Sequence, residues 1–498
     1  MERPFEKQTV PCLKRALWQV QDREQTQEVR LGDEMPDIGS ILSVRGQCVL
    51  RGKEWMGDSV TISGGVMVWA IYVPADGTGQ QMIESWIPVQ FKGSLSGSQR
   101  EGSIRCALEL RSLDGRTISP RKMMIRGVVS ALIEAMEPSD AAVAIPGQLP
   151  EDVQLLRRRY PMVLPAEAGE KSFLVDEELT LPAGGEAPEK IWGLQVVPRM
   201  DHPSVVGNKT VTRGVLQIHL CYQGVDGQLH SADLEAPFSQ FSDLDRDYEK
   251  EATVSVTPAL TNLEHELQEG KLQIRCGVTA QYVIWDCVMV ELIEDAYSVC
   301  RTVQPRQEPM ELPAILDQCT ETIRCEGTVS GSASQVVDAW ICHPQPRIRR
   351  AGDLYELEVS GTVGVAYLDQ SGKLQSGTGS FSQVVEHTAS EGSLVIAELA
   401  GAATPVVTVG PEQMDLRLEL TVQTRICARD GMTMVTALDL GDQTQPDPGR
   451  PSVIMRRSGG RSLWALAKVC GSTVEAISKA NGLTEEPTDD AMLLIPVV

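Results

Sequence analysis

The sequence lacks several features that would place it in common functional classes. Its longest apolar runs, such as Val66–Val73, are far shorter than the ~18–20 residues that a membrane-spanning helix needs. The first ten residues, MERPFEKQTV, contain acidic side chains and no apolar segment, so they do not resemble a secretory signal. Of the 498 residues, 42% are hydrophobic and 23% are charged, as in folded proteins. We therefore expect a soluble protein without an export signal, with about three to four domains.

Positive charge is also scarce in the chain. The 45 Lys and Arg residues stand against 68 Asp and Glu residues, which gives a net charge of -23. Phosphate backbones and anionic lipids repel so acidic a protein, so binding to nucleic acid or to a membrane surface is disfavoured. Residues 452–498 contain equal numbers of basic and acidic side chains, and the preceding residues carry the whole net charge. This difference indicates a separate module at the C-terminus.

The common patterns of catalytic and metal-binding residues are missing from the sequence. No C-x-x-C pair occurs among the 12 cysteines, which argues against zinc ribbons and redox dithiols. Four cysteines lie in alternating apolar stretches and are expected to be buried free thiols: Cys106, Cys221, Cys276 and Cys427. The 6 histidines form no H-E-x-x-H motif, and neither a P-loop nor a G-x-S-x-G sequence occurs. The acidic stretch Ser242–Glu251 lacks the order of EF-hand ligands, which favours a solvated loop over a calcium site. We expect no enzymatic activity, no catalytic residue, no metal and no cofactor.

One pattern occurs three times along the chain. An alternating apolar strand ends in a tyrosine, and a glycine follows five residues later. The tyrosines are Tyr72, Tyr222 and Tyr367, and the turns contain Asp76-Gly77, Asp226-Gly227 and Ser371-Gly372. Because glycine tolerates positive φ, each copy is predicted to be a strand that runs into a hairpin turn. Spacings of 150 and 145 residues between the tyrosines favour tandem domains of one fold.

Further extended segments recur at similar distances from these tyrosines. A short extended segment precedes each copy: Gln27–Leu31, Glu177–Leu181 and Glu321–Cys325. An alternating strand follows about 50 residues after each tyrosine: Met123–Ser130, Leu272–Ala280 and Leu416–Val422. Because helical periodicity is scarce, the predicted fold class is mainly β, with three tandem antiparallel β-sandwich-like domains followed by a small βααβ domain. The predicted domains are residues 1–145, 166–300, 316–442 and 452–498, with a linker at 443–451. Helices are predicted near Leu13–Gln25 and Leu155–Tyr160, and linkers near Glu137–Pro165, Thr302–Pro313 and Gly441–Pro451.

The C-terminal module has a different pattern of apolar residues from the three repeats. A strand is predicted at Val453–Arg457, and apolar residues at helical spacing follow from Leu463. The run Ser472-Thr473-Val474-Glu475 predicts a capping box at the start of a second helix, and Asn481-Gly482 predicts its left-handed end. A last strand is predicted at Met492–Ile495. The predicted order is therefore βααβ.

This module resembles a LysM domain over its whole length. The matching residues are Gly460, Ser462, Leu463, Trp464, Ala467, Gly471, Thr473, Val474, Glu475, Ile477, Ala480, Asn481, Gly482, Leu483, Leu493, Ile495 and Pro496. The family binds glycans in a groove between the loop before the first helix and the loop after the second. The resemblance therefore implies partner-binding residues at Gly460, Arg461, Ser462, Leu463, Asn481, Gly482 and Leu483. Arg461 stands where the family usually has Asp, and Leu463 and Trp464 are also candidates for the core.

The preceding chain resembles the SPOCS (DUF3794) domain. The resemblance rests on the run from Glu28 to Leu42, which contains Pro36-Asp37-Ile38 and Ile41-Leu42, and on the three repeats. Together with the LysM-like module, this layout resembles the SipL/SpoVID-type family of spore morphogenetic proteins. It implies a non-enzymatic scaffold of the mother-cell cytosol that binds the coat ATPase SpoIVA through LysM and helps the coat to encase the forespore. Two alternatives stay open at this point: a binder of peptidoglycan or N-acetylglucosamine oligomers, and an unrecognised hydrolase.

Overall fold

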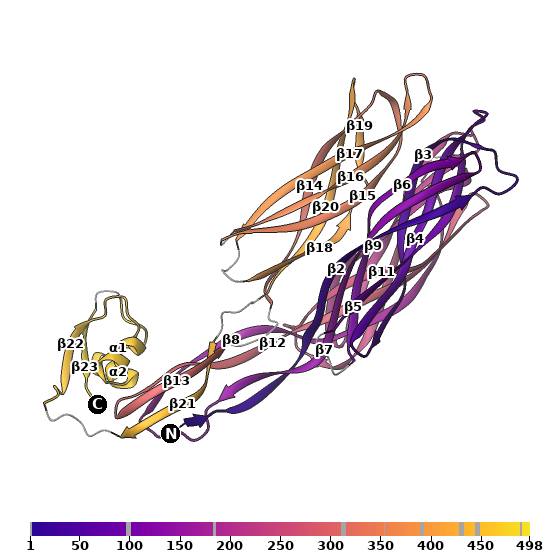
Figure 1. Cartoon of the computed structure of the whole chain (residues 1–498). Helices are drawn as coiled ribbons and strands as arrows, with labels where there is room; N and C mark the ends of the chain where they lie inside the picture. The colour runs from indigo at the N-terminus through magenta and orange to yellow at the C-terminus, as the bar shows by residue number, and fades with distance from the viewer. Residues whose placement is uncertain are drawn as a thin grey trace.

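The structure is a computed structural model that describes residues 2–95, 101–182, 186–309, 315–352, 354–388, 393–427, 433–443, 449–488 and 491–498. The prediction of a mainly β chain is confirmed, since strands fill most of the described residues, which contain two short helices near the C-terminus. Three β units pack together at one end of the molecule, a narrow stalk of strands leads away from them, and the C-terminal module lies at the end of the stalk (Figure 1). No helix among the described residues is long and apolar enough to cross a membrane.

The first two units are built from long strands. Those of the first are β2 (Glu6–Arg30), β3 (Ile38–Met56), β4 (Ser59–Pro74), β5 (Gln81–Ser94), β6 (Ser103–Ser119) and β7 (Lys122–Ile145). They form two antiparallel sheets, with the orders β2-β7-β6 and β3-β4-β5. The second unit contains β8 (Val153–Leu179), β9 (Pro188–Gly224), β10 (Leu229–Tyr248), β11 (Thr253–Gln268) and β12 (Lys271–Ser298). Here β8 and β11 flank β12, and β9 pairs with β10.

The third unit repeats this pairing scheme. Its strands are β14 (Ile315–Ser330), β15 (Ala333–Ala351), β16 (Leu354–Asp369), β17 (Leu374–Thr388), β18 (Leu394–Ala402), β19 (Val406–Val409) and β20 (Gln413–Cys427). β20 pairs with β14, β18 and β19, and β16 pairs with β15 and β17. In each unit the first strand therefore pairs antiparallel with the last strand, as β2 does with β7 and β8 does with β12.

The three predicted hairpins are present, and their glycines explain the turns. Gly77, Gly227 and Gly372 have φ of 75°, 75° and 78°, in the left-handed region that favours glycine. The strands on either side are β4 and β5, β9 and β10, and β16 and β17, in antiparallel register. The extended segments predicted before and after each repeat pair with each other, as Val29 does with Met123 and Ile323 does with Leu420.

The cores explain why β4 is apolar along almost its whole length. Val66, Val68 and Ala70 are fully buried in the core that the two sheets of the first unit share. Trp69, on the opposite face of β4, is fully buried in the core of the second unit. Both faces of this strand are therefore covered, and burial on both faces selects a continuous apolar run over an alternating one.

The predicted helices and two of the predicted linkers are wrong. Leu13–Gln25 lies inside β2, and Leu155–Tyr160 lies inside β8. The segment Glu137–Pro165 contains the end of β7 and the start of β8, and β13 (Arg301–Pro309) occupies most of Thr302–Pro313. These stretches extend the strands beyond the three units and form the stalk. Their polar residues and prolines suit a thin assembly in which much of each strand faces solvent.

The stalk has a small hydrophobic core of its own. β1 (Glu2–Pro4) and β13 pair with β21 (Thr433–Gln443), and the ends of β2, β7, β8 and β12 lie beside them (Figure 1). Buried side chains from five of these strands meet here: Cys12, Val143, Met162, Leu164, Leu292, Ile293, Val435 and Leu438. The predicted linker 443–451 begins at the last residue of β21, and its residues 444–448 lie outside the described part of the chain.

The C-terminal module has the predicted order of elements. It consists of β22 (Val453–Arg457), α1 (Leu463–Cys470), α2 (Val474–Asn481) and β23 (Met492–Pro496), and β22 pairs antiparallel with β23. α2 ends at Gly482 with φ of 63°, as predicted. Its N-cap is Thr473, whose side chain accepts from the Ala476 amide, so the predicted cap at Ser472 is wrong by one residue. Ser472 is instead buried, and its carbonyl faces the stalk.

Candidate functional site

The loop before α1 is shaped by glycine and by the buried Ser458. Gly459 and Gly460 have φ of 54° and 70°, which turns the chain sharply after β22. The amide of Arg461 donates to the Ser458 carbonyl at 3.1 Å. The Ser458 hydroxyl donates to the Thr488 carbonyl at 2.7 Å, which ties this loop to the segment after α2. One backbone and one side-chain hydrogen bond thus hold the loop, and the Arg461 side chain is exposed.

The two predicted recognition loops meet at the start of α1. The Ser462 hydroxyl caps the helix by accepting from the Ala465 amide at 3.3 Å. The Glu486 carboxylate accepts from the Leu463 amide at 2.8 Å, so an acidic side chain lies at the positive end of α1. This bond joins the loop before α1 to the loop after α2.

Two of the predicted binding residues have structural roles. The Leu463 side chain is buried in the core of the module, so only its backbone could meet a partner. Asn481 donates to the carbonyls of Ile477 and Leu494 and accepts from the Leu494 amide at 2.8 Å. Its side-chain amide therefore joins α2 to β23. Gly460, Arg461, Ser462 and Gly482 are exposed, and Leu483 is half-buried. No described residue forms a hydrogen bond or ion pair with the Arg461 guanidinium.

The module also docks against the stalk, which the sequence did not predict. Trp464 Nε1 donates to Asp295 Oδ2 at 2.8 Å, and Lys468 Nζ pairs with the same oxygen at 2.7 Å. The ring of Tyr297 meets the Trp464 ring edge-on at 4.7 Å, and its hydroxyl donates to the Ser472 carbonyl at 2.8 Å. Trp464 therefore faces the stalk. In the sequence, the only signal of this contact was a Trp and a Lys one helical turn apart.

Electrostatics supports this docking contact. Burial by itself raises the pKa of Asp295, but hydrogen bonds from Lys468 and Trp464 outweigh it and hold the pKa below its usual value. Burial raises the pKa of Tyr297 to about 12, so its hydroxyl keeps its proton and remains a donor. Asp295 is thus a carboxylate with three donor contacts from the module, and the contact is charge-assisted.

A second cluster of functional groups lies where the three β units meet. Arg45 of β3 pairs with Asp338 of β15, and its guanidinium stacks on Trp340 at 3.8 Å. His219 of β9 bonds Asp338 through Nε2 at 2.5 Å and Asp233 through Nδ1 at 2.7 Å. One buried ionisable group thus comes from each unit.

The pKa shifts in this cluster show that its members are charged. Burial lowers the pKa of His219, but the two aspartates outweigh it and raise the pKa to about 9. Burial raises the pKa of Asp338, but Arg45 and His219 outweigh it and hold the pKa well below its usual range. At neutral pH the cluster therefore contains an imidazolium, a guanidinium and a buried carboxylate.

A second set of buried ion pairs crosses the same junction. Arg105 of β6 contacts Glu134 of β7 and, in a bidentate pair at 3.0 and 3.2 Å, Glu398 of β18. Arg425 of β20 also pairs with Glu398, at 2.8 Å. The Arg105 guanidinium donates to Thr257 of β11 at 2.9 Å, so the second unit takes part as well. Both clusters are suited to holding the three units together.

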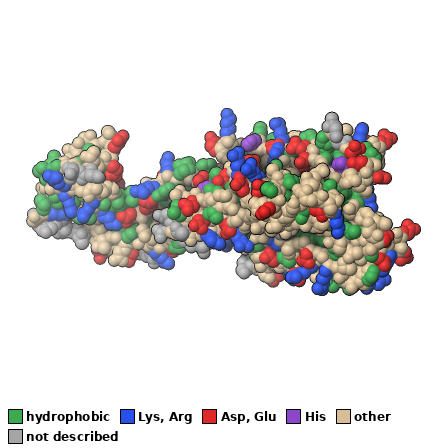
Figure 2. All heavy atoms as spheres, turned by 90° about the horizontal axis from the view of Figure 1, so that it is seen from above, with side chains coloured by type: hydrophobic (Ala, Val, Ile, Leu, Met, Phe, Trp, Pro, Cys, Tyr) green, Lys and Arg blue, Asp and Glu red, His purple; other side chains and the backbone are tan. Residues whose placement is uncertain are grey.

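Metal binding finds no support among the described residues. They contain no group of three His, Cys, Asp or Glu side chains that could hold an ion. The acidic stretch Ser242–Glu251 is not the predicted loop, because β10 runs to Tyr248 and Leu244 is buried. Three of the four cysteines expected to be buried free thiols are so, namely Cys106, Cys221 and Cys276, and the side chain of Cys427 lies outside the described part. Figure 2 shows acidic side chains scattered over the three units, and Lys and Arg gathered beside hydrophobic side chains on the C-terminal module.

In comparisons with known proteins, no family model, no curated protein and no solved structure matches the chain.

Proposed function

We propose that this chain is a non-enzymatic scaffold of the SipL/SpoVID type in spore-coat assembly. The three units are proposed to be SPOCS-like β-sandwich domains, and residues 452–498 a LysM domain that binds the coat ATPase SpoIVA in the mother-cell cytosol. The observation that carries the proposal is the position of the βααβ module at the end of a stalk, with the Arg461 loop exposed (Figure 1). A scaffold needs such a separation, because it must contact one partner without hindrance from its own body.

The contacts within the module favour a protein partner over a sugar. Neutral glycans are recognised by aromatic stacking and by side-chain amides, and here Trp464 faces Tyr297 while the Asn481 amide is saturated. The exposed Arg461 guanidinium instead offers a planar fork that matches a carboxylate. An acidic segment on the ATPase is therefore the proposed contact.

The test is binding of purified SpoIVA to the full chain and to variants of Arg461. We expect Arg461→Ala to weaken binding by about tenfold or more, the loss of one charge-assisted hydrogen bond of ~1.5–3 kcal/mol. Arg461→Asp should weaken it further, because the charge is reversed. Both losses should be larger at low salt, since an exposed ion pair is screened by added ions.

Lys479→Ala is the matched control, because Lys479 is another exposed cation of the same module, on α2. Its affinity should equal that of the unaltered chain, and circular dichroism should show all variants folded. Unchanged affinity in both Arg461 variants would refute the role of this residue. Full binding by a chain that lacks residues 452–498 would refute the module as the binding element.

Peptidoglycan or N-acetylglucosamine oligomers remain the alternative ligands. The exposed Gly460 and Gly482 on the two joined loops are the observation that favours them, because glycine lets a flat ligand approach the backbone. Sedimentation with purified cell wall separates the two functions. Saturable binding that disappears on removal of residues 452–498 would favour the glycan function.

A further inference from the structure

The two-stranded sheet of the C-terminal module has an apolar face that is turned to solvent. The other face of the sheet packs into the core of the module through Ile454, Leu493 and Ile495. The apolar face consists of Val453, Met455, Met492 and Leu494, which are 53%, 67%, 52% and 42% exposed. An antiparallel sheet with one solvated face normally carries polar side chains there. Contiguous exposed apolar side chains instead indicate contact with another molecule.

β22 also has an unpaired edge at two of its residues. β23 is its partner in the sheet, and the described residues contain no strand on its other side. The Ser458 amide donates to the Ala491 carbonyl at 2.9 Å, and the Val497 amide donates to the Ser452 carbonyl at 3.0 Å. Backbone groups alternate in direction along a strand, so the N–H and C=O groups of Val453 and Met455 point away from β23. Such an edge is a template for pairing with another strand.

The outer edge of β23 is closed by contrast. The Asn481 side chain donates to the Leu494 carbonyl at 2.6 Å and accepts from the Leu494 amide at 2.8 Å. Pro496 has no N–H to donate. Since Leu494 bonds to Asn481, it exchanges no hydrogen bonds with Met455 opposite it, which agrees with the outward direction of the Met455 backbone groups. A further strand can therefore be added beside β22 and not beside β23.

The distribution of charge favours a second copy of this chain as the source of that strand. Residues 452–455 and 491–498 contain no charged side chain, so an uncharged apolar strand fits beside them, and β22 is itself such a strand at Val453 and Met455. Residues 1–451 carry the whole net charge of -23, and the three packed units lie at the other end of the stalk (Figure 1). Contact between two copies through their modules therefore keeps the acidic units apart, whereas contact through those units is opposed by repulsion.

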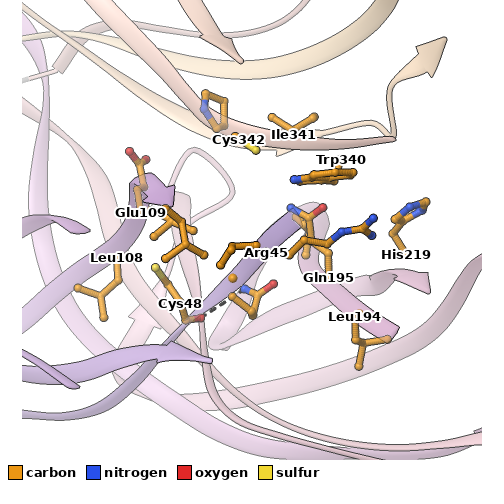
Figure 3. A pocket seen from close by; sticks show the side chains of 18 residues that line it. Arg45, Cys48, Leu108, Glu109, Leu194, Gln195, His219, Trp340, Ile341 and Cys342 are labelled. Atoms are coloured by element: carbon orange, nitrogen blue, oxygen red, sulfur yellow. Dashed lines mark hydrogen bonds between the residues drawn. The ribbon is translucent and has the colours of Figure 1, made fainter. Parts of the chain in front are cut away.

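The ionisable groups buried in the three units are already engaged within one chain. Figure 3 shows the Arg45 guanidinium beneath Trp340 and beside His219, and both Arg45 and His219 bond to Asp338. These groups join the units of one chain and offer nothing to a second copy. The module remains the surface that is suited to self-association.

We propose that β22 pairs antiparallel with β22 of a second copy, about a two-fold axis at Ile454. Val453 of each copy then lies opposite Met455 of the other, and each pair exchanges two N–H···O bonds with its side chains on the same face. At ~3.4 Å per residue the two Arg457 side chains stand about 20 Å apart, beyond the ~8–10 Å range of unscreened repulsion. The product is one continuous sheet across two modules, and it does not depend on what the Arg461 loop binds.

The experiment is sedimentation equilibrium of the full chain over a range of concentrations. We expect the apparent mass to rise from 54.3 kDa toward twice that value, with a dissociation constant below about 100 μM. Added salt should not weaken the dimer, because no ion pair contributes to it. A mass of 54.3 kDa at every concentration up to about 100 μM would overturn the proposal.

The decisive variant is Met455→Pro. It removes the outward N–H and leaves the bonds between β22 and β23 in place, and proline is tolerated on edge strands. The dissociation constant should rise at least about tenfold. If Met455→Pro fails to fold, Val453→Pro replaces it, because it blocks the neighbouring outward amide in the same way. An unchanged dissociation constant in the folded proline variant would overturn the proposal.

Two lysine variants separate edge pairing from other contacts. Met492→Lys alters the same apolar face on β23, away from the edge, and it should leave the dissociation constant unchanged. Met289→Lys is the matched control on β12, since Met289 is 60% exposed and lies in the stalk, and it should also have no effect. A dimer that is lost in Met492→Lys but kept in Met455→Pro would show packing through the apolar faces, and edge pairing would then be wrong.

Discussion

Trp464 shows how one residue acquires a role that its helix alone does not reveal. In the sequence, Trp464 directly follows Leu463 at the start of α1, and both residues are candidates for the core. The structure shows it half-buried, with its Nε1 on Asp295 and its ring on Tyr297. Its partners lie about 170 positions earlier in the chain. A single substitution here should therefore affect docking of the module more than its folding.

We predict that Trp464→Phe detaches the module from the stalk without unfolding it. Phe keeps the apolar ring for the core but loses the hydrogen bond to Asp295, which is a charge-assisted bond of ~1.5–3 kcal/mol. Small-angle X-ray scattering should show a broader distribution of distances between module and stalk. Lys479→Ala, on the exposed side of α2, is the control and should leave the scattering curve unchanged. A scattering curve for Trp464→Phe equal to that of the unaltered chain would contradict the prediction.

The same contact should depend on pH through Asp295. Its pKa is lowered in the docked state, so the contact is stabilised fully above the usual pKa of an aspartate, ~4. The stabilisation should be lost as the pH falls through the lowered pKa. Scattering between pH 3 and pH 7 measures this, and Asp295→Asn should abolish the dependence. A contact that loosens as the pH rises would contradict this prediction.

At the scale of the elements, hairpin turns and helix ends follow from local rules. Gly372 and its two counterparts have positive φ because the chain must reverse within a few residues. Ser462 and Thr473 are the N-caps of α1 and α2, and their hydroxyls accept hydrogen bonds from amides of the first helical turn. Such features depend on neighbours in the sequence, and they were predictable to within one residue.

The turn glycines allow a matched test of backbone strain. A Cβ at Gly372 would meet nothing within 4 Å, so Gly372→Ala should destabilise the third unit by the left-handed backbone alone, about 1–2 kcal/mol. Gly32→Ala is the control, since Gly32 is equally open but has no positive φ. Urea unfolding of the full chain measures both. Equal midpoints for the two variants would show that the turn carries no strain.

At the scale of the whole molecule, buried charge holds the three units together. His219, Arg45 and Asp338 come from different units, and each has lost most of its contact with water. Removing one partner of such a group leaves an uncompensated buried charge, which costs about 3–5 kcal/mol. The junction should therefore be the most sensitive part of the packed body to a single polar substitution.

We predict that Asp338→Asn lowers the unfolding free energy by about 3–5 kcal/mol. Arg324→Ala, which breaks an ion pair of 2.9 Å at the surface, should change it by less than about 1 kcal/mol. Since His219 has its pKa raised from 6.5 to about 9, its stabilisation is complete below pH 6.5 and is lost as the pH rises through 9. Urea titrations from pH 6 to pH 10 measure both effects. A His219→Gln chain with the same loss of stability across this range would contradict the assignment to His219.

The sequence by itself determined the mainly β character, the three hairpins and the order of elements in the C-terminal module. These follow from alternation, turn glycines and caps, which act over a few residues. Tertiary structure alone decided that Leu13–Gln25 and Leu155–Tyr160 are strand, because their pairing partners, such as Ile133 for Gln19 and Leu292 for Arg158, are remote in the chain. It also decided the stalk, the docking of Trp464 on Asp295 and the junction of Arg45, His219 and Asp338. These features are stabilised by contacts between residues far apart in the sequence, so the pattern of neighbouring residues does not predict them.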